Sequence, residues 1–304
     1  MALKQPLIHE IAERTWLINE FGCNDLYLLE GSERALLIDA GSGYCDLNKI
    51  IRSLTDKPFD VAITHAHPDH VGMMHQFDRI YINEKELNNK ERFEAMVKWK
   101  NYDTSDFYLV YNQHVADYDV WECTEENINK GDKDTEIVFI DEGYVFDLGD
   151  RKVWTGFLPG HSEGHLYFVD DLTKIAFTGD CVNANNGTSF HAASTHIRYI
   201  EKFLEGYGKT WNRIFTGHST YGGALNVVSL NVNVVRNLAN AYRALLRGEA
   251  TIEERASHLF PDGPKRQIII YGTQPSQDRN ATDPIVTPQV SPKLWEDGEE
   301  HIIP

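Results

Sequence analysis

Over the first 83 residues of the chain, short apolar runs alternate with polar turns. Four runs have the length of strands and are bounded by glycine, serine or charged residues: 15–19, 26–31, 34–41 and 79–83. Between them, apolar residues recur at helical spacing over 45–55, and a buried run at 60–63 continues into a loop. A second helix is expected over 70–77. This strand–helix–strand rhythm predicts sheets covered by helices.

The rhythm breaks over residues 84–135, which are rich in aromatic and charged side chains. The segment begins with a pattern compatible with a helix and then carries only weak strand signals. Two interpretations stay open. The insertion covers a binding site as a lid, or its aromatic residues form a small local core. Long insertions in compact domains often carry function, which keeps the lid interpretation in view.

Strand signals return after the insertion, and helices close the pattern. Four apolar runs follow one another with short turns between them: 136–140, 151–157, 165–170 and 174–180. A helix is expected over 196–206, a short strand over 213–218 and an amphipathic helix over 233–249. The end of the chain is polar and contains several prolines. We therefore expect one domain over residues 1–272 and an extended tail over 273–304.

The excess of acidic over basic residues bears on which molecules can bind the protein. The 304 residues include 46 Asp and Glu against 29 Lys and Arg, a formal net charge of −17. A field of that sign repels the phosphate backbone of nucleic acids, so no nucleic acid partner is expected. With 41% hydrophobic residues, the chain is long enough for a substantial core. We expect a small-molecule substrate, and a homo-oligomer is compatible with this composition.

Targeting and membrane signals do not stand out. The N-terminal stretch MALKQPLIHEIAERTW lacks the apolar core of a signal peptide. No apolar run approaches the ~20 residues of a membrane span. The cysteines are sparse and contain no CxxC pair: Cys23, Cys45, Cys123 and Cys181. Since this spacing is unlike a disulfide framework, we expect free thiols, no membrane association and a cytoplasmic location.

The densest chemistry lies in the stretch THAHPDH, directly after an apolar run. It crowds three histidines and a carboxylate together: His65, His67, Asp69 and His70. Neutral imidazole is the usual protein ligand of Zn²⁺, and carboxylate is an accepted partner. A purely structural alternative is that Asp69 caps a helix beginning at His70. Capping explains one residue of the four and leaves the histidines unexplained, which favours a metal site.

Three later segments each end a short apolar run with glycine and a potential ligand. PGHSEGH presents His161 and His165. TGD presents Asp180, and TGH presents His218. Glycine before the ligand lets the backbone turn sharply and aim the side chain off the strand end. A single Gly-Asp or Gly-His pair is weak support, but the full ordered set strengthens the prediction of a metal site.

This ordered set resembles the metallo-β-lactamase superfamily. The similarity covers roughly residues 12–84 and 136–225, and it includes LLIDAG before the first motif and RIYINEKE after it. The resemblance implies an α+β fold, a four-layer αβ/βα sandwich in which two mixed sheets face each other with helices outside. It also implies a site at one edge of that sandwich.

The resemblance implies a ligand for each position of a dinuclear centre. On one metal it implies three histidines: His65, His67 and His161. On the second it implies three further ligands: Asp69, His70 and His218. Asp180 would bridge the two ions. Seven nitrogen and oxygen ligands suit two Zn²⁺ ions, with Fe or Mn as alternatives, and leave room for a water.

Other residues near the motifs carry weaker expectations. His165 matches a position where family members often have histidine, and we expect it to support the site without binding metal. Asp39 either orients a metal-bound imidazole or simply ends its strand. Cys181 is expected to be a buried small residue, because Asp180 occupies the bridging position. The histidines without such spacing are expected at the surface or in packing: His75, His114, His191, His196 and His258.

A centre of this kind generates a metal-bridging hydroxide near neutral pH, which attacks an electrophilic carbon or phosphorus. Asp69 is a candidate proton acceptor. Tyr221 is a candidate hydrogen-bond donor to the developing oxyanion, with simple packing as the equal alternative. Aspartate at the bridging position is similar to glyoxalase II-type thioesterases and lactonases. We therefore expect a zinc-dependent hydrolase of a small thioester, lactone or ester.

Other functions stay open at this point. Persulfide dioxygenases resemble the same pattern but use a single iron, held by two histidines and an aspartate. A phosphodiesterase has a similar ligand set, and a metal-binding module without catalysis is a further alternative. Metal analysis separates the main classes, since two zinc ions per chain favour the hydrolase and one iron favours the dioxygenase.

Overall fold

The computed structural model describes residues 5–22, 24–87, 125–182, 193–207, 213–218, 229–255 and 265–270. Most of the insertion, at 88–124, lies outside the described residues, and so does the tail at 273–304. The lid interpretation and the domain boundary at residue 272 therefore stay predictions.

The first sheet is built from the N-terminal part of the chain. Its seven strands lie in chain order: β1 (Leu7–Ala12), β2 (Thr15–Glu20), β3 (Asn24–Glu30), β4 (Ala35–Ile38), β5 (Phe59–Ala62), β6 (Arg79–Ile82) and β7 (Glu136–Phe139). Strands β1 to β4 pair antiparallel, whereas β4 to β7 pair parallel. Because β4, β5 and β6 run in one direction, the segments that follow them emerge at the same edge of the sheet.

The second sheet gathers the strands after the insertion. In spatial order, its six strands are β13 (Leu230–Asn231), β12 (Arg213–Phe215), β11 (Ile175–Phe177), β10 (Leu166–Asp170), β9 (Lys152–Phe157) and β8 (Val145–Asp147). Strands β11 and β12 pair in parallel, and the other neighbours pair antiparallel. The parallel pair again brings two following segments to one edge.

The two sheets pack face to face around a shared apolar core. The ring centroid of Tyr27 on β3 lies 4.7 Å from that of Phe177 on β11. The Tyr27 hydroxyl also donates a 2.6 Å hydrogen bond to the carbonyl oxygen of Thr216, just after β12. Such an aromatic contact contributes about 0.5–1.5 kcal/mol beyond its buried area. These contacts hold the ends of β11 and β12 against the first sheet.

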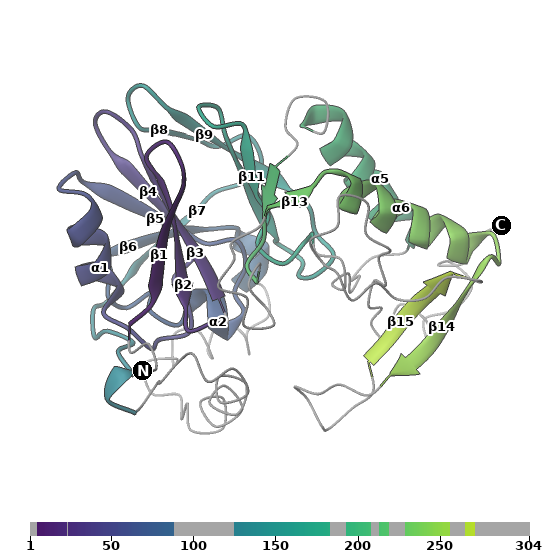
Figure 1. Ribbon diagram of the computed structural model, residues 1–304, viewed down its shortest axis with the longest axis horizontal. Helices are drawn as coiled ribbons and strands as arrows, with labels where there is room; N and C mark the ends of the chain where they lie inside the picture. The colour runs from purple at the N-terminus through teal and green to yellow at the C-terminus, as the bar shows by residue number, and fades with distance from the viewer. Residues whose placement is uncertain are drawn as a thin grey trace.

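Helices cover both outer faces of the sandwich (Figure 1). Helix α1 (Leu47–Leu54) packs on the first sheet through Leu47 and Ile51. Helices α5 (Ala193–Gly206) and α6 (Asn233–Leu246) share one apolar cluster with the second sheet. The order helix, sheet, sheet, helix confirms the expected α+β four-layer sandwich.

The helix expected over 70–77 is shorter and begins earlier. Helix α2 spans Pro68–Val71, and His67 is its N-cap residue. Asp69 therefore lies inside the first turn, and the alternative that Asp69 caps the helix is wrong. Proline at the start of a helix is favoured because its ring fixes a helical φ and no intrahelical partner for its nitrogen is needed there.

Contacts with the loop after β4 explain why α2 is so short. The backbone N–H of Gly72 donates to the Gly41 carbonyl at 2.6 Å, and that of Met73 donates to the Ala40 carbonyl at 2.8 Å. These donors are no longer directed along a helix. Gly72 also lies so close to the backbone of Ser42 that a Cβ atom would have no room. Tertiary contacts therefore override the local helical pattern.

Several short elements go beyond the pattern predicted from sequence: β1, β8, β13, the 3₁₀ helices η1 (Glu84–Leu87) and η3 (Glu125–Asn127), and the hairpin of β14 (Ala250–Arg255) and β15 (Lys265–Ile270). The hairpin lies beside α6, away from the sandwich (Figure 1). Most of these segments are too short to show a clear hydrophobic period.

Two further expectations concern the thiols and the membrane. Cys45 and Cys181 are free and buried, as expected, whereas Cys23 and Cys123 lie outside the described residues. Within the described ranges, no helix has the length and apolar character needed to cross a membrane. The cytoplasmic location stays a prediction.

Candidate metal centre

Ligand-type side chains gather at one edge of the sandwich, where strands of both sheets end. Strand β5 leads into the THAHPDH loop, the β9–β10 loop carries His161, β11 leads to Asp180 and β12 leads to His218. Three groups have ligand atoms within 4.8 Å of one another: His65, His67 and His161; His65, His70 and Asp180; and Asp69, His70 and His218. The structure thus brings all seven expected ligands together.

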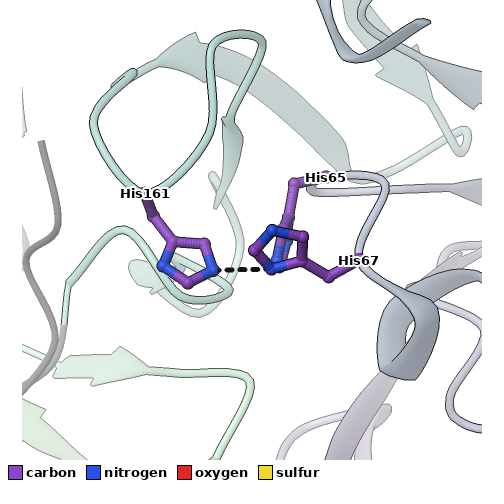
Figure 2. A group of neighbouring side chains, drawn as sticks. All are labelled: His65, His67 and His161. Carbon is purple, nitrogen blue, oxygen red and sulfur yellow. Dashed lines mark hydrogen bonds between the residues drawn. The ribbon is translucent and has the colours of Figure 1, made fainter. Parts of the chain in front are cut away.

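Three histidine rings converge from loops that belong to different sheets (Figure 2). The Nε2 atom of His161 lies 2.9 Å from the Nδ1 atom of His67. The ring centroid of His65 lies 4.4 Å from that of His67 and 4.8 Å from that of His161. Three imidazoles with nitrogens this close form a donor set suited to one zinc ion.

The carboxylate of Asp180 lies between the two groups of ligands. Its Oδ2 atom is 3.5 Å from His161 Nε2 and 3.2 Å from His218 Nε2. Its Oδ1 atom is 3.7 Å from His70 Nε2. Contact with histidines of both groups is what a bridging ligand requires.

The carboxylate of Asp69 approaches the second group from the more open side. Its Oδ2 atom lies 3.3 Å from His218 Nε2 and 3.7 Å from His70 Nε2. The side chain of Asp69 is 21% exposed, against 1% for His70. Burial alone would raise the pKa of Asp69, but the neighbouring His70 and His218 lower it, so the group is ionised.

A chain of hydrogen bonds behind the site orients two of the rings. Asp39 Oδ2 accepts from the Thr64 hydroxyl at 2.9 Å and lies 2.9 Å from His70 Nδ1. Because the Thr64 hydroxyl donates to Asp39, its oxygen can accept the proton of His65 Nδ1, 3.0 Å away. Both imidazoles then direct Nε2 toward the site. Of the two roles considered for Asp39, the structure supports orientation of an imidazole.

His165 lies behind the ligands and uses both ring nitrogens for the protein itself. Its Nδ1 donates to the Leu166 carbonyl at 2.9 Å, and its Nε2 accepts from the backbone N–H of Asp180 at 3.2 Å. The ring stacks on His65 with centroids 4.5 Å apart. This arrangement fits the expected supporting role and leaves no nitrogen for a metal.

The charges of the site favour a bound cation. Burial lowers the pKa of His65 well below its usual range and, with His67 nearby, lowers the pKa of His161 to about 3. Burial also disfavours charge on His70 and His218, but the adjacent carboxylates raise the pKa of both well above the usual value. Protons on these two rings supply the positive charge that the carboxylates need, and a metal can replace them.

The donor set fits two zinc ions, since it consists of imidazole nitrogens and carboxylate oxygens. Within the described residues, His65 Nε2 and His70 Nε2 are buried without a hydrogen-bond partner. A buried polar atom left in this state costs about 1–3 kcal/mol, which metal coordination would relieve. The number and identity of the metals are part of the proposal below.

Three residues expected outside the ligand set lie in packing in the part of the chain that the structure describes. Cys181 donates its thiol to the Thr178 carbonyl at 3.0 Å, and burial raises the pKa of that thiol well above its usual value. His75 and His196 are buried, and the latter lies under the His161 loop with Nδ1 3.3 Å from the Pro159 carbonyl. The other residues considered lie outside the described part of the chain: His114, His191, His258 and Tyr221.

Sequence reasoning missed the roles of Thr64 and Glu86, and it gave Gly217 only a role in the turn before His218. Thr64 links Asp39 to His65, and its place at the head of the motif is the only signal in the sequence. Glu86 is buried and bonds to both ligand loops, although it looks like an ordinary charged residue. Gly217 touches the ligands so closely that a Cβ atom there would lie 2.6 Å from Asp180 Oδ1.

Comparison with known proteins identifies the family. A family model described as the metallo-beta-lactamase superfamily matches residues 24–228, more than half of the chain. The chain belongs to the metallo-β-lactamase superfamily. This confirms the resemblance carried by the ligand motifs.

Two relatives of the chain are named as thioesterases, which are hydrolases. The chain is 26% identical over 231 residues to the human (Homo sapiens) acyl-coenzyme A thioesterase MBLAC2, covering 69% of this chain and 78% of that protein. It is 22% identical over 221 residues to the atrochrysone carboxyl ACP thioesterase of Claviceps purpurea, covering 71% of this chain but 56% of that protein. Together with the family, these relatives identify the chain as a hydrolase.

Solved structures support the fold alone. The metallo-beta-lactamase from Pontibacter korlensis superposes with a TM-score of 0.52 at 15% identity, covering 79% of this chain and 99% of that one. The agreement over nearly the whole of a family member shows that the two-sheet sandwich is shared.

Proposed function

We propose that this protein is a dinuclear zinc-dependent thioesterase that acts on a small-molecule acyl thioester. The observation that carries the proposal is the convergence of seven imidazole and carboxylate side chains at one edge of the sandwich. The choice of thioester over lactone or simple ester rests on the relatives, which are named as thioesterases. Carried over by family resemblance, His65, His67 and His161 would hold one ion, and Asp69, His70 and His218 the other, with Asp180 between them.

When bound, the two zinc ions would supply an activated water at neutral pH and polarise the thioester carbonyl. The chain's own residues then handle orientation and protons. Asp39 and Thr64 keep the His70 and His65 rings facing the site. Asp69 lies beside His218 and His70 and is partly exposed, so its position suits it to accept the proton of the attacking water and return it to the departing thiolate.

The proposed hydrolysis accounts for each bond that forms or breaks. The water oxygen forms a bond to the carbonyl carbon, the carbon–sulfur bond breaks, and the products are a carboxylic acid and a thiol. A thiolate is a good leaving group, which reduces the demand on Asp69 as a proton donor. Tyr221 is a further candidate for stabilising the oxyanion.

A substrate screen on protein of measured metal content tests the proposal. Acyl-coenzyme A thioesters and acyl-pantetheine thioesters should be hydrolysed faster than lactones, carboxylic esters, phosphodiesters and β-lactams. The protein should carry two zinc ions per chain and lose activity when a chelator removes them. Faster turnover of a lactone or phosphodiester would reject the thioester assignment. One iron per chain, with oxygen consumed in the presence of a persulfide, would reject the hydrolase mechanism in favour of a dioxygenase.

A further inference from the structure

Glu86 is a buried carboxylate that none of the ligand motifs contains. It lies in η1, which opens the insertion, and it is 1% exposed. A buried ionisable group costs free energy unless hydrogen bonds satisfy it. The bonds made by Glu86 therefore show which parts of the molecule need it.

Those bonds reach both loops that carry the first group of histidines. Glu86 Oε2 accepts from the backbone N–H of Ala66, which lies between His65 and His67, at 2.8 Å. Its Oε1 accepts from the Ser162 hydroxyl at 2.5 Å and from the Gly164 backbone N–H at 2.7 Å. One carboxylate thus bonds on one side to the THAHPDH loop and on the other to the His161 loop.

Close packing makes this arrangement specific. A Cβ atom at Gly164 would lie 2.7 Å from the Glu86 backbone nitrogen and 2.9 Å from its Cγ atom. The loop can approach Glu86 only because residue 164 is glycine. The two loops belong to different sheets and approach each other where His161 and His67 lie 2.9 Å apart.

We infer that Glu86 is a positioning residue that sets the separation of His67 and His161, and with it the affinity of the metal held by the first group of histidines. Asp39 contacts the His70 ring directly, whereas Glu86 acts on this group through two backbone N–H groups and the Ser162 hydroxyl of the loops. Because η1 begins the insertion, the same carboxylate anchors the start of the insertion beside the metal centre. The inference rests on the proposal that the site binds a metal. It does not depend on the proposed thioesterase activity.

Glu86→Gln is the most direct variant, because it keeps the size of the side chain. In the variant, an NH2 group replaces one of the two carboxylate oxygens. This group faces the hydrogen-bond donors of one loop, so that loop loses its acceptor. The zinc affinity of the first histidine group should fall ~10–100-fold, the usual range when a group supporting a ligand is lost. Zinc affinity is measured by competition with a chromophoric chelator. The visible spectrum of the cobalt-substituted protein, which reports coordination geometry, should change as well.

Asp170→Asn is the matched control. Asp170 is a fully buried carboxylate bound to Arg151 at 2.8 Å, at the far end of β10 from His165. Its loss should lower the melting temperature while leaving zinc affinity and the cobalt spectrum unchanged well below that temperature. Equal losses of zinc affinity in both variants would overturn the inference, because they would reflect general destabilisation.

Ser162→Ala is a milder variant, in case Glu86→Gln does not fold. It removes one of the three hydrogen bonds and keeps the charge. A weaker first zinc site and an altered cobalt spectrum would support the inference. A folded Ser162→Ala or Glu86→Gln variant with wild-type zinc affinity and an unchanged cobalt spectrum would overturn it. No substrate is used, so these outcomes are independent of the substrate screen.

Discussion

At the scale of single residues, Asp180 is a carboxylate in contact with histidines of both groups. Its Oδ2 atom lies 3.2 Å from His218 Nε2 and 3.5 Å from His161 Nε2, and its Oδ1 atom lies 3.7 Å from His70 Nε2. The neighbouring thiol of Cys181 turns away toward the Thr178 carbonyl. A charge shared between two ions offsets their mutual repulsion, so the bridging position should be the least replaceable one.

Asp180→Ala and Asp180→Asn test that position. We expect the bound zinc to fall from two ions to one, and turnover to fall by more than about 100-fold, beyond the loss typical of a group that merely supports a ligand. Cys181→Ser is the control, and it should keep both ions. Metal analysis and steady-state kinetics measure the two effects. Full activity in Asp180→Ala would show that the bridging ligand has been assigned to the wrong residue.

Gly217 offers a steric test of the same centre without changing any ligand. In Gly217→Ala the added Cβ would lie 2.6 Å from both Asp180 Oδ1 and His70 Cε1, closer than real contacts allow. Because both groups must shift, zinc affinity should fall ~10-fold or more. Gly206→Ala is the control, since a Cβ there meets nothing within 4 Å. Equal zinc affinities of the two variants in chelator competition would contradict the geometry of the site.

The convergence of the candidate ligands could be predicted from sequence because each follows an apolar run that ends at the same edge of the sandwich. His65, Asp180 and His218 were singled out by the ordered set of motifs together with the family resemblance, since each alone is weak support. Thr64 and Glu86 could not be found in this way. Their roles depend on which atoms of another loop their side chains reach, and a hydroxyl or carboxylate at those positions is also common on protein surfaces.

At the scale of elements, the long periodic segments were predicted well and the contact-dependent ones were not. Helices α1, α5 and α6 bury a continuous apolar face, which their spacing reveals. Helix α2 ends early because the loop after β4 takes its backbone donors. Strand β13 is two residues long, and its extended conformation is stabilised by pairing with β12. Local patterns therefore predict an element only where the element buries its own face.

Helix α5 also supports a ligand loop, which gives an element-scale prediction. Gly160 precedes His161 and lies against the His196 ring, so that a Cβ atom on Gly160 would clash with that ring. Gly160→Ala should displace the loop and weaken zinc binding ~10-fold. Adding His196→Ala removes the clashing ring, so the double variant should recover part of the loss. A double-mutant cycle on zinc affinity measures this coupling, and additive losses would contradict the contact.

At the scale of the whole molecule, the metal centre joins the two halves of the sandwich. The first sheet supplies the THAHPDH loop, whereas the second sheet supplies His161, Asp180 and His218. Because the candidate ligands come from both sheets, a bound metal would stabilise the sandwich as a whole and not one loop. Any ligand that binds only the folded state raises its free energy of unfolding. The stability of the fold should therefore depend on metal, and through the histidines on pH.

The direction of the pH dependence follows from the histidines of the metal-free site. The pKa values of His70 and His218 are raised, so their stabilisation is present below the unfolded value of about 6.5 and is lost as pH rises through the raised values. The pKa values of His65 and His161 are lowered, so their contribution is lost as pH falls below about 6.5. Metal-free protein should thus be most stable near pH ~6.5.

Zinc bound as proposed would replace the protons of His70 and His218, so the loaded protein should not share the alkaline loss of stability. We expect the melting temperature of the metal-free form to fall between pH 6.5 and pH 9, and the gap between loaded and metal-free forms to widen over that range. Thermal unfolding at each pH, with and without chelator, measures both. In metal-free Asp180→Asn one of the carboxylates that raise these pKa values is neutral, so the alkaline fall should be smaller. A gap that stays constant from pH 6.5 to pH 9 would contradict the idea that protons and zinc compete for the same nitrogens.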